Sequence, residues 1–196
     1  MIAQDVHRAG RRPWVPYPLG LRVWRDVLSS FKRYAEGGAM ATRQTRQAAR
    51  AEVVVEALPE EAFQIFTDEI GLWWRRDTPY WNDPERGRAI RIEPRVGGRF
   101  LEVYDLEAGT GFEVGRVTAW EPGSRLGLTW TQASWPEGIS TDIEVTFEPA
   151  DGGTLVRLEH SGFERVPDAE KSLRRYDAGW KTVLGWFAEQ INARRG

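Results

Sequence analysis

The side chains that most often carry out acid–base or nucleophilic chemistry near neutral pH are scarce in this chain. It contains no cysteine and two histidines, His7 and His160. The lack of cysteine excludes disulfides, zinc ribbons, iron–sulfur clusters and thiol catalysis. A two-histidine metal site would need both imidazoles, and a nucleophilic triad would depend on His160 alone. We therefore expect no metal and no cofactor, and His160 is the one candidate for a catalytic base.

His160 ends a segment in which polar and apolar residues alternate. Thr154, Val156, Leu158 and His160 share one face, so the imidazole is predicted to point to the apolar side of a strand. Three roles are open to it: a general base in a cavity, a hydrogen-bond partner for the polar end of a ligand, or a structural histidine satisfied by Tyr176 or a backbone carbonyl. We favour the polar end of a pocket over the centre of a reaction.

Among the carboxylates, Glu102 is the candidate with a role beyond surface charge. If it points inward, it is a buried carboxylate that needs a partner such as Arg91 or Arg116. If its neighbours in the strand point inward instead, it is a solvated charge, and alternation does not decide between the two. Asp142 and Glu144 share the outward face of their strand and are predicted to be solvated.

The elements that position His160 form a strand–turn–strand–helix unit over residues 141–192. Apolar and polar residues alternate at 141–148 and at 154–160, which predicts two antiparallel strands with one buried face. Asp151-Gly152-Gly153 supplies residues that tolerate positive φ, as a tight hairpin requires. We expect a sheet folded over the helix that follows.

That helix is predicted to start after Pro167, with Asp168 as its N-cap. Its apolar residues recur at three- and four-residue spacing and form one stripe. The stripe consists of Leu173, Tyr176, Trp180, Val183, Leu184, Phe187 and Ile191. Gly179, beside the stripe, costs about 1 kcal/mol relative to alanine inside a helix, so we expect another segment to approach the backbone closely there.

The remaining residues complete an α+β fold with an antiparallel sheet. A first strand at 51–57 is followed by two short helices, the first beginning at Pro59-Glu60-Glu61 and the second covering 69–74. An irregular stretch follows at 75–87. Further strands are predicted at 88–93, 99–106, 112–120, 125–131, 140–149 and 154–161. Because strands and helices do not alternate after the first unit, a parallel sheet is excluded.

Composition and charge limit the classes of function. The chain has 196 residues and a net charge of −2, but residues 1–39 hold seven Lys/Arg against three acids, which leaves −6 on residues 40–196. An acidic body argues against nucleic-acid binding. No apolar run approaches the roughly 20 residues of a membrane span, and no secretion signal is evident, so a cytoplasmic location is expected.

Residues 1–39 differ from the rest in their basic character. We interpret them as an N-terminal extension that is poorly ordered or forms a short amphipathic helix near 21–31. Ten tryptophans are unusual, and Trp73, Trp74, Trp81 and Trp135 fall where loops or the open end of a sheet are expected. They either surround the mouth of a cavity for an apolar ligand or fill an irregular core.

Five short motifs occur in an order that resembles a known family. They are Val54-Val55-Glu56-Ala57-Leu58-Pro59-Glu60-Glu61-Ala62-Phe63, Glu93-Pro94-Arg95-Val96-Gly97-Gly98-Arg99-Phe100, Trp120-Glu121-Pro122 with Leu128-Thr129-Trp130, Gly152-Gly153-Thr154 with Glu159-His160-Ser161-Gly162-Phe163, and Gly179-Trp180. Together they resemble the START-like (SRPBCC) superfamily, within the bacterial group named after the C-terminal domain of the activator of the Hsp90 ATPase. The resemblance covers about residues 50–192.

This resemblance implies a helix-grip fold, in which a curved antiparallel sheet of six or seven strands wraps around the long C-terminal helix and leaves a cavity. It makes residues 40–196 a single START-like domain. Residues 1–39 are too short to be the additional N-terminal domain with which the chaperone activator contacts Hsp90. The fold itself does not fix the chemistry, because members of the superfamily include lipid carriers, hormone receptors and cyclases.

Three functions remain open. The first is binding of a small hydrophobic or amphipathic molecule, and the second is a cyclase- or hydrolase-like enzyme that uses His160 and Glu102. The third is a protein–protein adaptor or a stress-related partner of a chaperone, and assembly as a homodimer is open as well. The residues expected to line a ligand cavity are Trp74, Tyr80, Trp81, Phe112, Trp130, His160, Phe163, Tyr176 and Trp180.

Overall fold

A computed structural model describes residues 47–194, and the expectations for residues 1–39 lie outside this range. The described residues form a seven-stranded sheet, two short helices and one long helix. In chain order the elements are β1 (Ala49–Val55), α2 (Pro59–Thr67), α3 (Ile70–Trp73), β2 (Ala89–Ile92), β3 (Arg99–Asp105), β4 (Thr110–Glu121), β5 (Arg125–Trp130), β6 (Thr141–Ala150), β7 (Gly153–Ser161), a 3₁₀ turn η1 (Phe163–Arg165) and α4 (Ala169–Ala193).

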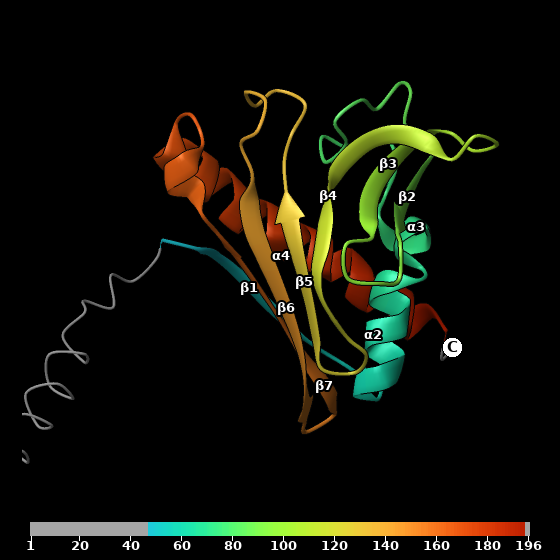
Figure 1. The fold of residues 1–196 in the computed structure, drawn as a ribbon. Helices are drawn as coiled ribbons and strands as arrows, with labels where there is room; N and C mark the ends of the chain where they lie inside the picture. Colours follow the sequence, from blue (N-terminus) through green and yellow to red (C-terminus); the bar gives the residue numbers. More distant parts are fainter. Residues whose placement is uncertain (1–46, 195–196) are drawn as a thin grey trace, which may run out of the picture. The chain divides into compact units, whose positions relative to one another are not determined.

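The sheet is antiparallel throughout and has the order β1-β7-β6-β5-β4-β3-β2. It curls around α4, with α2 and α3 packed beside the helix at the β2–β4 end (Figure 1). This is the predicted helix-grip architecture, and the predicted elements are confirmed with boundaries that differ by one or two residues. The short turn η1 is an addition that the sequence pattern did not indicate.

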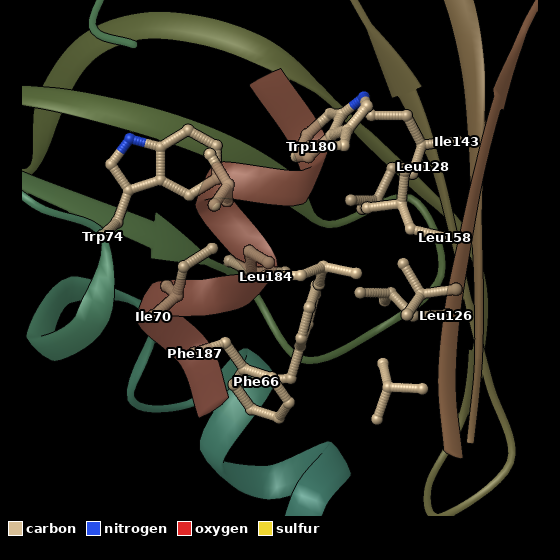
Figure 2. Close-up of a cluster of buried hydrophobic side chains, with 14 of the residues drawn as sticks. Phe66, Ile70, Trp74, Leu126, Leu128, Ile143, Leu158, Trp180, Leu184 and Phe187 are labelled. Atoms are coloured by element: carbon tan, nitrogen blue, oxygen red, sulfur yellow. The ribbon is translucent and has the colours of Figure 1, made fainter. Parts of the chain in front are cut away.

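The inner face of the sheet and the stripe of α4 form one hydrophobic core. Leu126, Leu128, Ile143 and Leu158 project from the strands toward the helix, as Figure 2 shows. On the other side of α4, side chains from α2 and α3 close the core, and Phe66 packs against Phe187 with ring centroids 5.2 Å apart. Burying this apolar surface is the main force that holds sheet and helix together.

The turns on either side of β7 show how local sequence directs the chain. Gly152 and Gly153 have φ angles of 87° and 134°, so the predicted glycine turn between β6 and β7 is confirmed. The helix start differs from the prediction: Asp168 occupies the N-cap position, but its φ of 52° is left-handed and its side chain makes no capping bond. A capping residue needs an extended backbone to aim its side chain at the first amides, which explains the difference.

No helix within residues 47–194 is long and apolar enough to cross a membrane.

Candidate functional site

Side chains fill most of the space between the sheet and α4. The hollow enclosed near the centre of the core by Phe66, Leu128, Leu158, Trp180 and their neighbours measures about 10 Å³. That is at the lower limit for holding a single water molecule, about 10–15 Å³. In this conformation the sheet and helix of the described domain therefore enclose no space of ligand size at this point.

A second hollow, of about 40 Å³, opens at the end of the core along the N-terminal half of α4. An engineered apolar cavity that binds benzene measures about 150 Å³, so the space accommodates the edge of a ring or a group of a few atoms. Its lining comes from the loop after α3, the end of β5 and one face of α4. The lining residues are Trp74, Pro79, Tyr80, Trp130, Gln132, Arg175, Tyr176, Gly179, Trp180 and Val183.

The walls of this hollow are aromatic rings, several of which contact one another edge to face. Trp130 lies 5.4 Å from Trp180 and 6.2 Å from Tyr176 between ring centroids, and Trp74 lies 6.2 Å from Trp180. Such pairs contribute about 0.5–1.5 kcal/mol each beyond the area they bury. The walls are therefore held in place before any ligand enters.

His160 lies behind this wall and is completely buried, with an exposed fraction of 0%. The indole nitrogen of Trp180 donates a hydrogen bond to Nδ1 at 3.0 Å, and Nε2 lies 2.7 Å from Oγ1 of Thr141. Because an indole N–H can only donate, Nδ1 is unprotonated and Nε2 carries the hydrogen. The Thr141 hydroxyl in turn donates a hydrogen bond of 3.2 Å to the carbonyl oxygen of Trp130.

The electrostatics agree with this assignment. Burial, together with a smaller effect of the positive charge of Arg165, lowers the pKa of His160 to about 3. The ring is therefore neutral at physiological pH, with both nitrogens occupied. The sequence had suggested Tyr176 or a backbone carbonyl as the partner of a structural His160. In the structure its partners are Thr141 and Trp180. Tyr176 instead packs against the imidazole, with ring centroids 4.6 Å apart.

The hydroxyl of Tyr176 is the polar group at the wall of the hollow. It accepts a hydrogen bond of 2.8 Å from the indole nitrogen of Trp130, its one hydrogen-bond partner among the residues the structure describes. Burial raises the pKa of Tyr176, against smaller lowering effects of the Trp130 hydrogen bond and the Arg175 charge. The hydroxyl therefore stays protonated, and its hydrogen is free to be donated.

Glu102 is buried, with an exposed fraction of 1%, and it faces the loop at 75–87. Its carboxylate accepts hydrogen bonds from the backbone amides of Asn82 at 2.7 Å and Asp83 at 2.8 Å. The side-chain amide of Asn82 adds a longer bond at 3.3 Å. The prediction that an inward Glu102 would pair with Arg91 or Arg116 is wrong. Arg116 pairs with Glu113 instead. Backbone amides can satisfy a buried carboxylate without any cation.

These bonds position the mouth of the hollow. Asn82 also accepts a hydrogen bond at 2.9 Å from the backbone amide of Ala133 in the loop between β5 and β6. The two loops that carry Tyr80 and Gln132 to the mouth are thereby tied to each other and to β3. A Cβ added at Gly179 would lie 3.0 Å from the Tyr80 ring, so the close approach expected at this glycine is real.

The structure brings together five of the nine residues expected to line a ligand site: Trp74, Tyr80, Trp130, Tyr176 and Trp180. The other four lie elsewhere. His160 and Phe163 form the layer behind Trp180 and Tyr176, with their own rings 4.5 Å apart. Trp81 folds back on its own loop through a hydrogen bond to the Arg75 carbonyl, and Phe112 lies in a surface groove beside Tyr104.

Five lining residues were missed from the sequence: Pro79, Gln132, Arg175, Gly179 and Val183. Val183 belongs to the apolar stripe of α4, and Gly179 had already been identified by its helix-breaking cost. Both were available signals. Gln132 and Arg175 are polar residues with no distinguishing pattern, so only the fold places them. Of the four tryptophans singled out, Trp73 is a core residue that packs on Phe187.

A curled antiparallel sheet that grips a long C-terminal helix defines the class of protein, an α+β START-like domain. The family model described as "Activator of Hsp90 ATPase homolog 1-like protein" matches residues 56–191. The chain belongs to this family, as the five sequence motifs had indicated.

The individual proteins that resemble this chain share about a third of its residues or fewer in the aligned regions. A protein of Schizosaccharomyces pombe, the uncharacterized protein C1711.08, is 31% identical over 113 residues, which is 54% of this chain. The match covers only 32% of that yeast protein. The crystal structure of MLL2253 from Mesorhizobium loti has a TM-score of 0.56 at 24% identity, covering 76% of this chain and 98% of the other. The solution structure of the Aha1 dimer from Colwellia psychrerythraea has a TM-score of 0.54 at 21% identity, with the same coverage. At such identities these structures establish the fold alone.

Proposed function

We propose that this protein binds a small apolar or amphipathic molecule at the aromatic hollow beside α4. The proposal rests on one observation: five aromatic side chains meet at this hollow, and one of them, Tyr176, has a hydroxyl hydrogen that is free to be donated. Ligand sites in proteins combine apolar walls with a few convergent polar groups in this way. The proposed site lies at the end of the core and not in a cavity along its length.

The size of the hollow defines how a ligand would enter. About 40 Å³ is too small for a whole ring, so a bound molecule inserts its edge and lies partly in the mouth, or displaces Tyr80. Tyr80 is suited to move, because it sits on an irregular loop and is only half-buried. The filled core below excludes deep insertion unless side chains rearrange.

The cyclase- or hydrolase-like alternative loses its proposed base. His160 has no exposed surface, and both ring nitrogens are engaged within the protein. A general base must reach the proton it abstracts, directly or through one water. We also propose a cytoplasmic location, with which a chain that forms no disulfide is consistent.

Nuclear magnetic resonance of the indole N–H groups tests the proposal. Titration of the full chain with indole and 2-phenylethanol should shift the indole N–H resonances of Trp130 and Trp180 in a saturable manner, while Trp73 in the core stays unchanged. No saturable shift at Trp130 and Trp180 with either compound would remove the case for this site.

Two glycines of α4 provide a matched pair of variants. Gly179→Ala adds a methyl group against Tyr80 in the lining, whereas a Cβ at Gly185 meets nothing within 4 Å. Both changes replace glycine with alanine inside a helix, which favours the helical conformation by about 1 kcal/mol. We expect Gly179→Ala to weaken binding of 2-phenylethanol about fivefold or more, since the methyl group occupies space comparable to the hollow itself. Gly185→Ala should leave the affinity unchanged.

A further inference from the structure

We propose that the preferred ligand is an anion, in the simplest case a carboxylate carried on a planar or apolar body. This inference rests on the proposed binding site and specifies the chemistry of its ligand. It follows from the polar groups at the mouth of the hollow, which supply hydrogen-bond donors and a positive charge and no negative charge.

The lining of the hollow carries positive charge and no negative charge. Arg175 is the single ionisable group with a full charge in the lining, and no acid accompanies it. Within residues 47–194 its guanidinium takes part in no hydrogen bond or ion pair. Its neighbour Arg174 differs, because it lies outside the lining and pairs with Glu170 at 3.4 Å. An uncommitted guanidinium presents a planar set of donors that suits a carboxylate.

The second donor is the Tyr176 hydroxyl. Since its oxygen already accepts from the Trp130 indole, the group that approaches its hydrogen must be an acceptor. The charge of Arg175 acts on this same hydroxyl, because it lowers the Tyr176 pKa against the larger effect of burial. A phenol hydrogen and a guanidinium that line the same hollow suit the two oxygens of one carboxylate.

The third polar group is the side-chain amide of Gln132 in the loop between β5 and β6. It lines the hollow, and among the described residues the amide itself makes no hydrogen bond. An amide can donate or accept, so it neither requires nor excludes an anion. The selectivity is therefore carried by Arg175 and Tyr176, while the aromatic walls take the apolar body whatever its end group.

Three probes with one ring and different end groups test this inference on the full chain: phenylacetate, 2-phenylethanol and 2-phenylethylammonium. Their dissociation constants are measured from the Trp130 and Trp180 indole resonances at pH 7.5 and low salt. We expect phenylacetate to bind about tenfold more tightly than the alcohol, because charge-assisted hydrogen bonds are stronger than neutral ones. The ammonium should bind most weakly.

Variants then assign the effect to its source. Arg175→Gln should bring phenylacetate close to the affinity of the alcohol and weaken phenylacetate much more than the alcohol, while Arg174→Gln should change neither. Tyr176→Phe should weaken both, with a thermal unfolding curve to verify that the chain is folded. Equal affinities for phenylacetate and the alcohol, or equal effects of the two arginine variants, would overturn the inference and leave the binding site standing. Absence of binding by all three probes would remove the site as well.

Discussion

Two buried polar side chains on the inner surface of the sheet, His160 on β7 and Glu102 on β3, are satisfied in different ways. His160 bonds to side chains of regular elements, Trp180 on α4 and Thr141 on β6. Glu102 bonds mainly to the backbone amides of an irregular loop. Both residues are almost completely buried, so the difference lies in what holds them and not in their depth.

The difference assigns distinct roles to the two ends of the site. The imidazole is held between a strand and a helix that already pack together, and it stiffens the back wall of the hollow. The carboxylate joins β3 to an irregular loop through the amides of Asn82 and Asp83, and this loop carries Tyr80 at the mouth. Buried, fully bonded networks rigidify the region they occupy. Ligand entry is therefore expected at the Glu102 side, where the wall is an irregular loop and not a packed strand and helix.

Removal of the imidazole should cause the largest loss of stability at either of these two residues. His160→Ala leaves the Trp180 indole N–H without an acceptor, removes one of the two partners of the Thr141 hydroxyl and opens a cavity in the core. We expect a loss of about 3–5 kcal/mol in the free energy of unfolding, measured by chemical denaturation.

Thr141→Val is the matched control for that variant. It keeps the side-chain shape and removes one hydrogen-bonding group of the chain from Trp180 to the Trp130 carbonyl. The expected loss is about 1–2 kcal/mol. If His160→Ala cost no more than Thr141→Val, the imidazole would not be the central member of the wall.

The pH dependence of stability examines the same residue without removing it from the core. Its pKa is about 3 in the folded protein and about 6.5 when unfolded. Between these values only the unfolded chain takes up the proton, so the free energy of unfolding falls as the pH falls below 6.5. His160 should account for a loss of about 2 kcal/mol between pH 7 and pH 5.

His160→Gln isolates this contribution, since it cannot titrate while the carboxylates and His7 remain in both chains. The stability difference between wild type and variant should shrink by the same amount over that interval and stay constant above pH 7. A difference that does not change with pH would show that the imidazole ionises in the folded state, and the closed description of this wall would be wrong.

The sequence predicted the His160 side of the site far better than the Glu102 side. Alternation placed Thr154, Val156, Leu158 and His160 on the buried face, and the structure has them there. Regular spacing works because strand and helix geometry fix where each side chain points. The same rule failed at Glu102, because Leu101 and Val103 are buried too, and a strand covered on both faces gives no alternation to interpret.

The mouth of the hollow illustrates a second limit. Its groups come from three separate segments, and the bond from Ala133 to Asn82 joins loops 51 residues apart in the sequence. Propensity and periodicity are local, so they carry no information about which irregular segments meet. The αL start at Asp168 and the η1 turn were missed for a related reason: short side chains such as aspartate tolerate several backbone conformations.

Glu102→Gln should have a smaller effect, confined to the loop that the carboxylate holds. The amide keeps the shape but replaces one acceptor oxygen with a donor, which then faces a backbone N–H of Asn82 or Asp83. The loss in global stability is limited by the cost of opening the loop alone, so we expect about 1–2 kcal/mol. Amide hydrogen exchange at residues 82 and 83 should rise about tenfold, while exchange in β6 and β7 changes little.

Glu113→Gln serves as the control, because its carboxylate pairs with Arg116 on a solvent-exposed surface of the neighbouring strand. Such pairs contribute about 0–1 kcal/mol, and this variant should leave exchange in the loop unchanged. If Glu102→Gln instead accelerated exchange uniformly through the sheet, the carboxylate would be an integral part of the core, as His160 is. Both ends of the hollow would then be equally rigid, and a ligand would not be expected to enter by displacing Tyr80.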